Sequence, residues 1–346
     1  MPTRRFPLML AAALAVPLAH PALAPLPAEA QAPTALTGEI IAGEGGAMEG
    51  VLVSARKAGS TVTVTVVSDA QGRYRFPPSK LPPGRYELGI RAVGFELAGP
   101  GAVDVAPRTL TIVDLKLRKA QDLAKQLTNA EWLSSMPGSH AEKTVLLGCV
   151  QCHTLERVVR SPHDAPAFLQ VMQRMGTYTN QSTPLHIQTR RAERLLEVRG
   201  EERERARQQL AEFLAGVNLG SASTWKYPLT TLPRPTGRGT RVVITEYDLP
   251  RPTIQPHDVI VDPDGIAWFC NFGEQTLGKL DPKTGKVTEY KMPELKPGFP
   301  TGALSVRFDR DGNLWLGMMF RAASRSSTGR RRRSRRGACP PSTTRT

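Results

Sequence analysis

The segment Cys149-Val150-Gln151-Cys152-His153 decides how the central part of this chain is interpreted. Its pattern is Cys-x-x-Cys-His, the signature of covalent haem attachment. Two thiols at this spacing can form thioether bonds with the two vinyl groups of one haem, and the histidine that follows can give a ring nitrogen to the iron. The sequence therefore predicts one covalent haem c, attached to Cys149 and Cys152, with His153 as the proximal iron ligand.

Two other kinds of site use a Cys-x-x-Cys pair. A redox disulfide of this type usually lies in a thioredoxin-like βαβ pattern, which the flanking sequence lacks. A structural zinc site needs a second pair of ligands at short spacing, whereas Cys270 and Cys339 are remote from the motif. Zinc, a disulfide and a chance match remain the alternatives to haem.

Residues 1–32 have the three parts of a secretory signal peptide. Arg4 and Arg5 give a positive end, a run of small and apolar residues broken by prolines follows, and Ala30-Gln31-Ala32 is an A-x-A cleavage pattern. The prolines argue against a membrane anchor, because a spanning helix needs about 20 apolar residues. We therefore expect a protein of the bacterial periplasm, with no transmembrane segment after cleavage of the signal peptide.

The net charge of +15 is unevenly distributed along the chain. Nine arginines and no acidic residue lie between Arg321 and Thr346, so this tail carries more than half of the net charge. A segment of Arg, Ser, Gly, Pro and Thr without periodicity cannot bury apolar surface, so we expect 321–346 to be disordered. The regular pattern stops after Phe320, which favours an out-of-frame translation of the tail. A genuine basic tail would instead bind anionic lipid or nucleic acid; we expect no nucleic-acid partner.

Residues 33–118 alternate apolar and polar side chains in short runs, as in Thr61-Val62-Thr63-Val64-Thr65-Val66. Turn residues separate the runs, for example in Asp69-Ala70-Gln71-Gly72 and Pro82-Pro83-Gly84, where glycine and proline supply the backbone angles of tight turns. Alternation with period two, interrupted by turns every eight to twelve residues or so, predicts an all-β sandwich.

The same stretch resembles the carboxypeptidase regulatory-like family. The residues that carry this resemblance are Gly50, Val51, Val53, Asp69, Gly72, Tyr74, Phe76, Leu81, Pro83, Gly84, Tyr86, Gly94 and Phe95. The resemblance implies a non-catalytic module with a structural or adhesive role, in some cases with glycan contact. No catalytic cluster occurs in this stretch, so we expect the structural role.

Residues 119–222 change to helical patterns on both sides of the haem motif. Ser139 is expected to cap a helix that leads into the motif, and Asp164, with Pro166 in the first turn, is expected to cap a second helix. A third helix is expected over 191–217, with an apolar face in its last turns. An all-α region around a single Cys-x-x-Cys-His resembles a class I cytochrome c domain.

Domains of the class I cytochrome c type often use a methionine as the second iron ligand, and its thioether raises the reduction potential. Met175 is our candidate, because it precedes Gly176 at the end of the second predicted helix. Met172 lies inside that helix, where a packing role is expected. Met172, His163 and the absence of a protein ligand remain open as alternatives.

Short strands return from about residue 227, and two sequence patterns occur twice. Thr245-Glu246-Tyr247 recurs 43 residues later as Thr288-Glu289-Tyr290, and Asp262-Pro263-Asp264-Gly265 recurs 47 residues later as Asp309-Arg310-Asp311-Gly312. Periods of about 40 to 50 residues, with a tryptophan and a glycine in each copy, indicate propeller blades, so 227–320 is predicted to form about two blades. The glycine falls too early for an EF-hand, so we expect each Asp-x-Asp-Gly to be a hairpin turn and not a calcium loop.

This last region resembles the streptogramin lyase (virginiamycin B lyase) family of β-propellers. The resemblance rests on Pro256-His257-Asp258-Val259, on 264–269 and on 277–285. It implies a closed ring of blades whose metal and catalytic histidine come from late blades, and 227–320 does not reach those blades. We therefore expect a structural role for His257, no catalytic residue in this chain and no lyase activity from the truncated propeller.

The sequence thus predicts a multidomain protein with an all-β sandwich, an all-α class I cytochrome c-like domain and a partial β-propeller, in that order. The function we expect is electron transfer with a periplasmic redox partner. Two alternatives remain, a propeller lyase or oxidoreductase with an auxiliary haem, and a module that binds a glycan or a protein partner.

Overall fold

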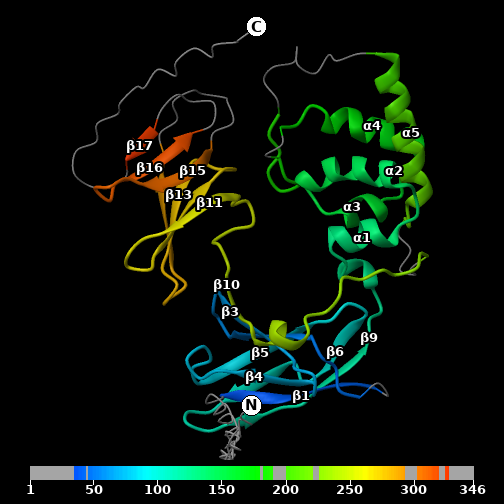
Figure 1. Cartoon of the computed structure of the whole chain (residues 1–346). Helices are drawn as coiled ribbons and strands as arrows, with labels where there is room; N and C mark the ends of the chain where they lie inside the picture. Colours follow the sequence, from blue (N-terminus) through cyan, green and yellow to red (C-terminus); the bar gives the residue numbers. More distant parts are fainter. Residues whose placement is uncertain are drawn as a thin grey trace, which may run out of the picture. The chain divides into compact units, whose positions relative to one another are not determined.

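The computed structural model describes residues 35–43, 46–179, 182–189, 200–220, 226–292 and 302–318, together with the backbone of 324–326 (Figure 1). The predicted signal peptide, the first part of the predicted third helix and most of the tail lie outside the described residues. β-strands predominate in the described ranges, and the α-helices lie between residues 129 and 217. Within these ranges, no helix has both the length and the apolar character needed to cross a membrane.

Two β-sheets form the sandwich. The first contains, in spatial order, β4 (Arg73–Phe76), β1 (Leu36–Ala42), β9 (Leu115–Lys119) and β6 (Phe95–Gly99), and β8 (Thr111–Ile112) also pairs with β1. The second contains β10 (Val243–Tyr247), β3 (Val62–Val67), β2 (Leu52–Lys57), β5 (Gly84–Arg91) and β7 (Ala102–Val105). The sandwich predicted from the alternating pattern is confirmed.

The alternation of the sandwich strands places one apolar face of each sheet in a shared core. Leu36 and Ile40 of β1 and Tyr74 and Phe76 of β4 are all fully buried in this core. The rings of Tyr74 and Phe76 meet edge to face at 6.0 Å, and the Tyr74 hydroxyl donates a hydrogen bond to the carbonyl oxygen of Val113 over 2.6 Å. The one polar group that this buried ring carries is therefore satisfied.

The edge of the second sandwich sheet is covered by β10, a strand that follows the helical region in the sequence. β10 pairs antiparallel with β3, from Val243 opposite Val66 to Tyr247 opposite Val62. Its Thr-Glu-Tyr sequence is repeated in β14, yet the two copies have different neighbours. The strand that we expected in the partial propeller thus extends the sandwich sheet, because an uncovered edge leaves backbone groups without hydrogen-bond partners.

Two further antiparallel sheets follow β10. One contains β11 (Pro256–Val261), β12 (Ala267–Asn271), β13 (Thr276–Leu280) and β14 (Val287–Lys291), and the other contains β15 (Ala303–Phe308), β16 (Leu314–Met318) and β17 (Ser324–Ser326). Cys270 and Leu277 of the first sheet and Val306 and Leu316 of the second belong to one buried cluster. β17 lies inside the tail that we expected to be disordered; it pairs with β16 through its backbone, which requires no apolar side chain.

The two Asp-x-Asp-Gly segments form equivalent hairpin turns, as predicted. The Asp262 carboxylate accepts hydrogen bonds from backbone N–H groups within its turn and from the Trp268 indole N–H over 2.8 Å. The Asp309 carboxylate accepts the corresponding bonds, including one from the Trp315 indole over 2.7 Å. The Trp315 hydrogen bond is the main reason that the pKa of Asp309 is lowered to about 2. These carboxylate oxygens hold a turn together.

We expect Asp309→Ala to speed hydrogen exchange at the backbone amides of Asp311 and Asn313, which lose their acceptor. In the wild-type protein the native pKa of Asp309, about 2, lies below its ordinary value of about 3.9. The stabilisation is therefore complete above about pH 4 and is lost as the pH falls through 2 or so. Exchange measured by mass spectrometry tests this, with the exposed Asp311→Ala as the matched control. Equal exchange rates in both variants would contradict the assignment.

The helical segments between residues 123 and 217 lie on both sides of the Cys-x-x-Cys-His motif. They are η2 (Leu123–Lys125), α1 (Asn129–Ser135), α2 (His140–Val145), η3 (Leu146–Gln151), α3 (Leu155–Val159), α4 (Ala165–Met175) and α5 (Glu201–Val217). Their shared core contains the fully buried Trp132 of α1, together with Leu155, Phe168 and Leu214. The third predicted helix is present over the residues of α5.

Candidate functional site

The Cys-x-x-Cys-His motif follows a capped helix, as its sequence predicts. The Ser139 hydroxyl accepts a hydrogen bond from the Glu142 backbone N–H, and the Glu142 carboxylate accepts one from the Ser139 backbone N–H over 2.8 Å. This capping box satisfies two N–H groups that the first turn of α2 would otherwise leave without partners. The chain then tightens into η3, which carries Cys149, and the motif ends just before α3.

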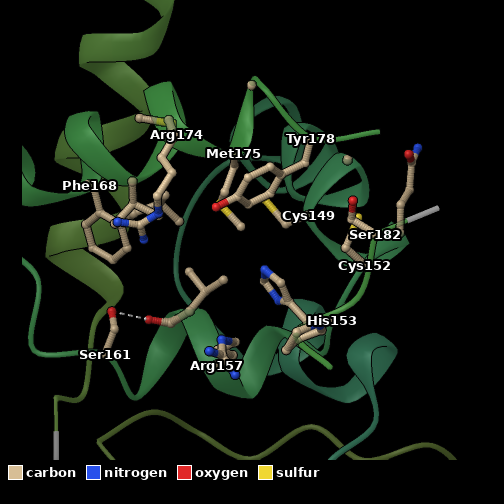
Figure 2. Close-up of a pocket in the computed structure, with 18 of the residues that line it drawn as sticks. Cys149, Cys152, His153, Arg157, Ser161, Phe168, Arg174, Met175, Tyr178 and Ser182 are labelled. Atoms are coloured by element: carbon tan, nitrogen blue, oxygen red, sulfur yellow. Dashed lines mark hydrogen bonds between the residues drawn. The ribbon is translucent and has the colours of Figure 1, made fainter. Parts of the chain in front are cut away.

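A cavity of about 700 Å³ opens beside the motif (Figure 2). Cys149, Cys152 and His153 line one part of it, and Met172 and Met175 of α4 line another. The structure therefore brings together every residue that the sequence predicted for the haem site. His163, left open as an iron ligand, also borders the cavity, with its ring edge to face against Phe168 at 5.5 Å.

Cys149 and Cys152 are free and half-buried. Burial raises the pKa of the Cys149 thiol, and the neighbouring Cys152 adds to the effect. Burial likewise raises the pKa of Cys152. Both side chains are therefore thiols at neutral pH, whereas the reactive cysteine of a redox Cys-x-x-Cys pair has a lowered pKa. Their environment argues against a catalytic disulfide.

The imidazole of His153 is oriented by the residue that follows it. Its Nδ1 donates a hydrogen bond to the Thr154 carbonyl oxygen over 2.9 Å, so the proton of the neutral ring lies on Nδ1 and Nε2 keeps a lone pair. The backbone N–H of Leu155 donates to the Asn129 side chain over 2.9 Å, which joins the end of the motif to α1. Figure 2 shows the His153 ring directed into the cavity.

Met175 and Met172 occupy different environments on α4. Met175 is the last residue of the helix, with 36% of its surface exposed, and Figure 2 shows it across the cavity from His153. Met172 lies one turn earlier, half-buried, and packs against the helical core. Asp164 caps the helix by accepting a hydrogen bond from the Ala167 N–H over 2.8 Å, as predicted. The buried Phe168 fixes the inner face of α4.

Three further residues that border the cavity were not predicted from the sequence, namely Arg157, Arg174 and Tyr178. Arg157 follows His153 by only four residues and lies in α3, so its nearness to the motif could have been noticed. Arg174 and Tyr178 reach the cavity only because α4 and the turn after it pack beside the motif. No short sequence pattern predicts that packing.

The remaining polar candidates form no comparable site. Among the described residues, no three His, Cys, Asp or Glu side chains gather in a group that could hold a metal ion. His257 of β11 is exposed and contacts Phe272 at 5.5 Å. Arg251, which precedes β11, forms ion pairs with Glu274 and Glu289, so its charge is already paired.

Comparison with known proteins identifies the sandwich. Residues 35–118 match the sequence profile of the carboxypeptidase regulatory-like domain, which confirms the resemblance drawn from the turn and core residues. No protein among the curated sequences matches the chain.

Part of the structure is similar to solved structures that include two streptogramin lyases. Virginiamycin B lyase from Staphylococcus aureus matches at 21% identity with a TM-score of 0.23, over 27% of this chain and 30% of that chain. A streptogramin B lyase structure matches at 21% identity with a TM-score of 0.22, over 27% and 29%. The Bacillus anthracis TIE protein matches at 14% identity with a TM-score of 0.21, over 25% and 16%. This chain therefore spans less than a third of each of these structures.

Asp164→Ala should destabilise the helical part of the chain by about 1 kcal/mol, the usual cost of losing a side-chain N-cap. Thr154→Ala is the matched control, because Thr154 occupies the N-cap position of α3 without making a side-chain cap hydrogen bond. Chemical denaturation followed by circular dichroism at helical wavelengths measures both variants. An equal loss of stability in the two variants would show that the Asp164 cap contributes nothing.

In the haem-free folded chain, Cys149 and Cys152 should react with iodoacetamide several-fold more slowly at pH 8 than in the unfolded chain. Their raised pKa values keep the thiolate fraction low, so the rate should climb as the pH increases through 9 and above. Alkylation timed by peptide mass spectrometry measures this. Rapid modification at pH 6 to 7 or so would instead indicate a redox-active pair.

Proposed function

We propose that this chain is an exported c-type cytochrome, which binds one haem covalently and transfers electrons to or from a periplasmic redox partner. The observation that carries the proposal is the cavity that two free thiols and an oriented imidazole share with two methionines. Its volume of about 700 Å³ lies in the ordinary range of ligand pockets, roughly 300–1,000 Å³. Size and donor groups therefore fit a haem attached through a Cys-x-x-Cys-His motif.

The two cysteines and the histidine of the motif each have a defined role in this proposal. Cys149 and Cys152 form the two thioether bonds, and their half-buried thiols are not diverted into a disulfide in the free chain. His153 offers Nε2 to the iron, and the hydrogen bond from Nδ1 to the Thr154 carbonyl oxygen fixes the tautomer and makes Nε2 a better donor. The haem, when bound, supplies an iron that gains and loses one electron.

Met175 is the residue that we propose as the second protein ligand of a bound haem iron. Its place at the end of α4 leaves the side chain free to turn, whereas Met172 is committed to the helical core. A thioether ligand favours the reduced iron and raises the reduction potential. Because Met175 is 36% exposed, the cavity reaches the surface beside it, which gives a partner a route for electron exchange.

The proposal also assigns a role to each of the other parts of the chain. The helical region from 119 to 222 is a class I cytochrome c-like domain, and 1–32 is the signal peptide that directs the chain to the periplasm. The carboxypeptidase regulatory-like sandwich has a structural role, and glycan binding is the alternative to it. The sheets β11–β14 and β15–β17 are two blades of a partial propeller, to which we assign no catalysis.

Expression with haem-maturation machinery should give a red protein whose colour survives acid-acetone extraction and whose motif peptide carries the mass of haem. Cys149→Ala together with Cys152→Ala should abolish this covalent attachment. Cys270→Ala is the matched control, because Cys270 is buried in the last pair of sheets and does not border the cavity. A colourless wild-type protein from competent cells would refute the proposed function.

Met175→Ala should lower the midpoint potential and change the visible spectrum of the reduced protein, because the iron loses its thioether ligand. Met172→Ala is its control and should leave the spectrum unchanged. Potentiometric titration with optical detection measures both variants. If Met172→Ala alone changes the spectrum, Met172 and not Met175 is the ligand.

A further inference from the structure

The charges that border the cavity all have one sign. Arg157 of α3 and Arg174 of α4 line it, and no Asp or Glu occurs among the described lining residues. Neither arginine forms an ion pair within the described part of the chain, whereas the nearby Arg160 binds Asp122 through two hydrogen bonds of 2.8 and 2.9 Å. Two guanidinium groups beside a cavity without a carboxylate form a site for anionic groups.

The two arginines lie at the rim of the cavity. Both are exposed, so their charges remain hydrated while the rest of the lining is largely apolar. Figure 2 shows Arg174 beside Phe168, across the cavity from Cys149 and Cys152. Arg157 comes from the helix that follows His153 and lies on the histidine side. A flat ligand held by the two cysteines would therefore present its far edge to the arginines.

The constitution of haem matches this arrangement. Its two vinyl groups lie on one edge of the porphyrin, and its two propionate groups lie on the opposite edge. Thioether bonds to Cys149 and Cys152 fix the vinyl edge at the cysteine side of the cavity. We propose that Arg174 and Arg157 bind the two haem propionates, an inference that rests on the proposed function.

This binding gives the arginines a role that the thioether bonds do not perform. A guanidinium group can form two parallel hydrogen bonds with one carboxylate, and such charge-assisted pairs are the stronger hydrogen bonds of proteins. In the folded chain, the two arginines hold the propionate edge of the porphyrin at the solvent-exposed rim, away from the cysteines. They also make the site selective for a porphyrin dicarboxylate over an uncharged ester.

Haem affinity without thioether bonds tests the proposal directly. In the full chain carrying Cys149→Ala and Cys152→Ala, addition of Arg174→Gln should weaken the binding of protohaem roughly tenfold, as expected for one hydrogen bond to a charged group. The same substitution should leave the binding of protohaem dimethyl ester unchanged, because the ester carries no carboxylate. Arg157→Gln should behave likewise. Arg203→Gln, an exposed charge on α5 outside the cavity lining, is the matched control. Titrations followed by absorption give the affinities.

An equal loss of affinity for the acid and the ester would overturn the proposal, and so would unchanged binding of the acid. A second measurement applies if the cysteine-free chain fails to fold. In the wild-type holoprotein, the resonance Raman bending band of the propionates should shift in Arg174→Gln and remain in place in Arg203→Gln. An unshifted band in Arg174→Gln would sink the inference while leaving covalent attachment intact. A wild-type protein without haem would refute the proposed function itself.

Discussion

The site depends on one buried contact, in which Trp132 of α1, Leu155 of α3 and Phe168 of α4 pack into a common core. Isolated helices shorter than about 12–15 residues are marginal in water, and α1, α3 and α4 all fall below that length. Tertiary packing must therefore hold them in place. Because His153 lies two residues before the start of α3 and Met175 ends α4, the same core sets the separation of the two cavity walls.

Features that depend on a few neighbouring residues could be read from the sequence. The caps formed by Ser139 and Asp164 involve groups three residues apart, and the turns at Asp262 and Asp309 close within four to six residues. The alternation of the sandwich strands predicts their buried face for the same reason. In each case the interacting groups are fixed by local backbone geometry, so a short pattern contains the necessary information.

Features that depend on distant partners could not be read in this way. Thr245-Glu246-Tyr247 and its repeat at Thr288 have the same sequence, but β10 pairs with β3 whereas β14 pairs with β13. Ladder hydrogen bonds join backbone groups and carry little information about side-chain identity, so the repeat could not reveal which edge β10 would cover. The motif predicted Cys149 and His153 as site residues, but the approach of Arg174 required α4 to pack in three dimensions.

The half-buried residues of the cavity wall are uncharged, whereas the exposed residues of its rim include two arginines, and this difference has a physical reason. Half-buried groups such as Cys149 and Met172 are tolerated because they are uncharged, and burial keeps the Cys149 thiol protonated. A guanidinium in the same place would lose its hydration without a counter-charge, which is costly. Arg157 and Arg174 therefore stay exposed. In the proposed haem protein, the apolar wall would favour the iron state of lower charge, and the cationic rim would hold the propionates outside the apolar interior.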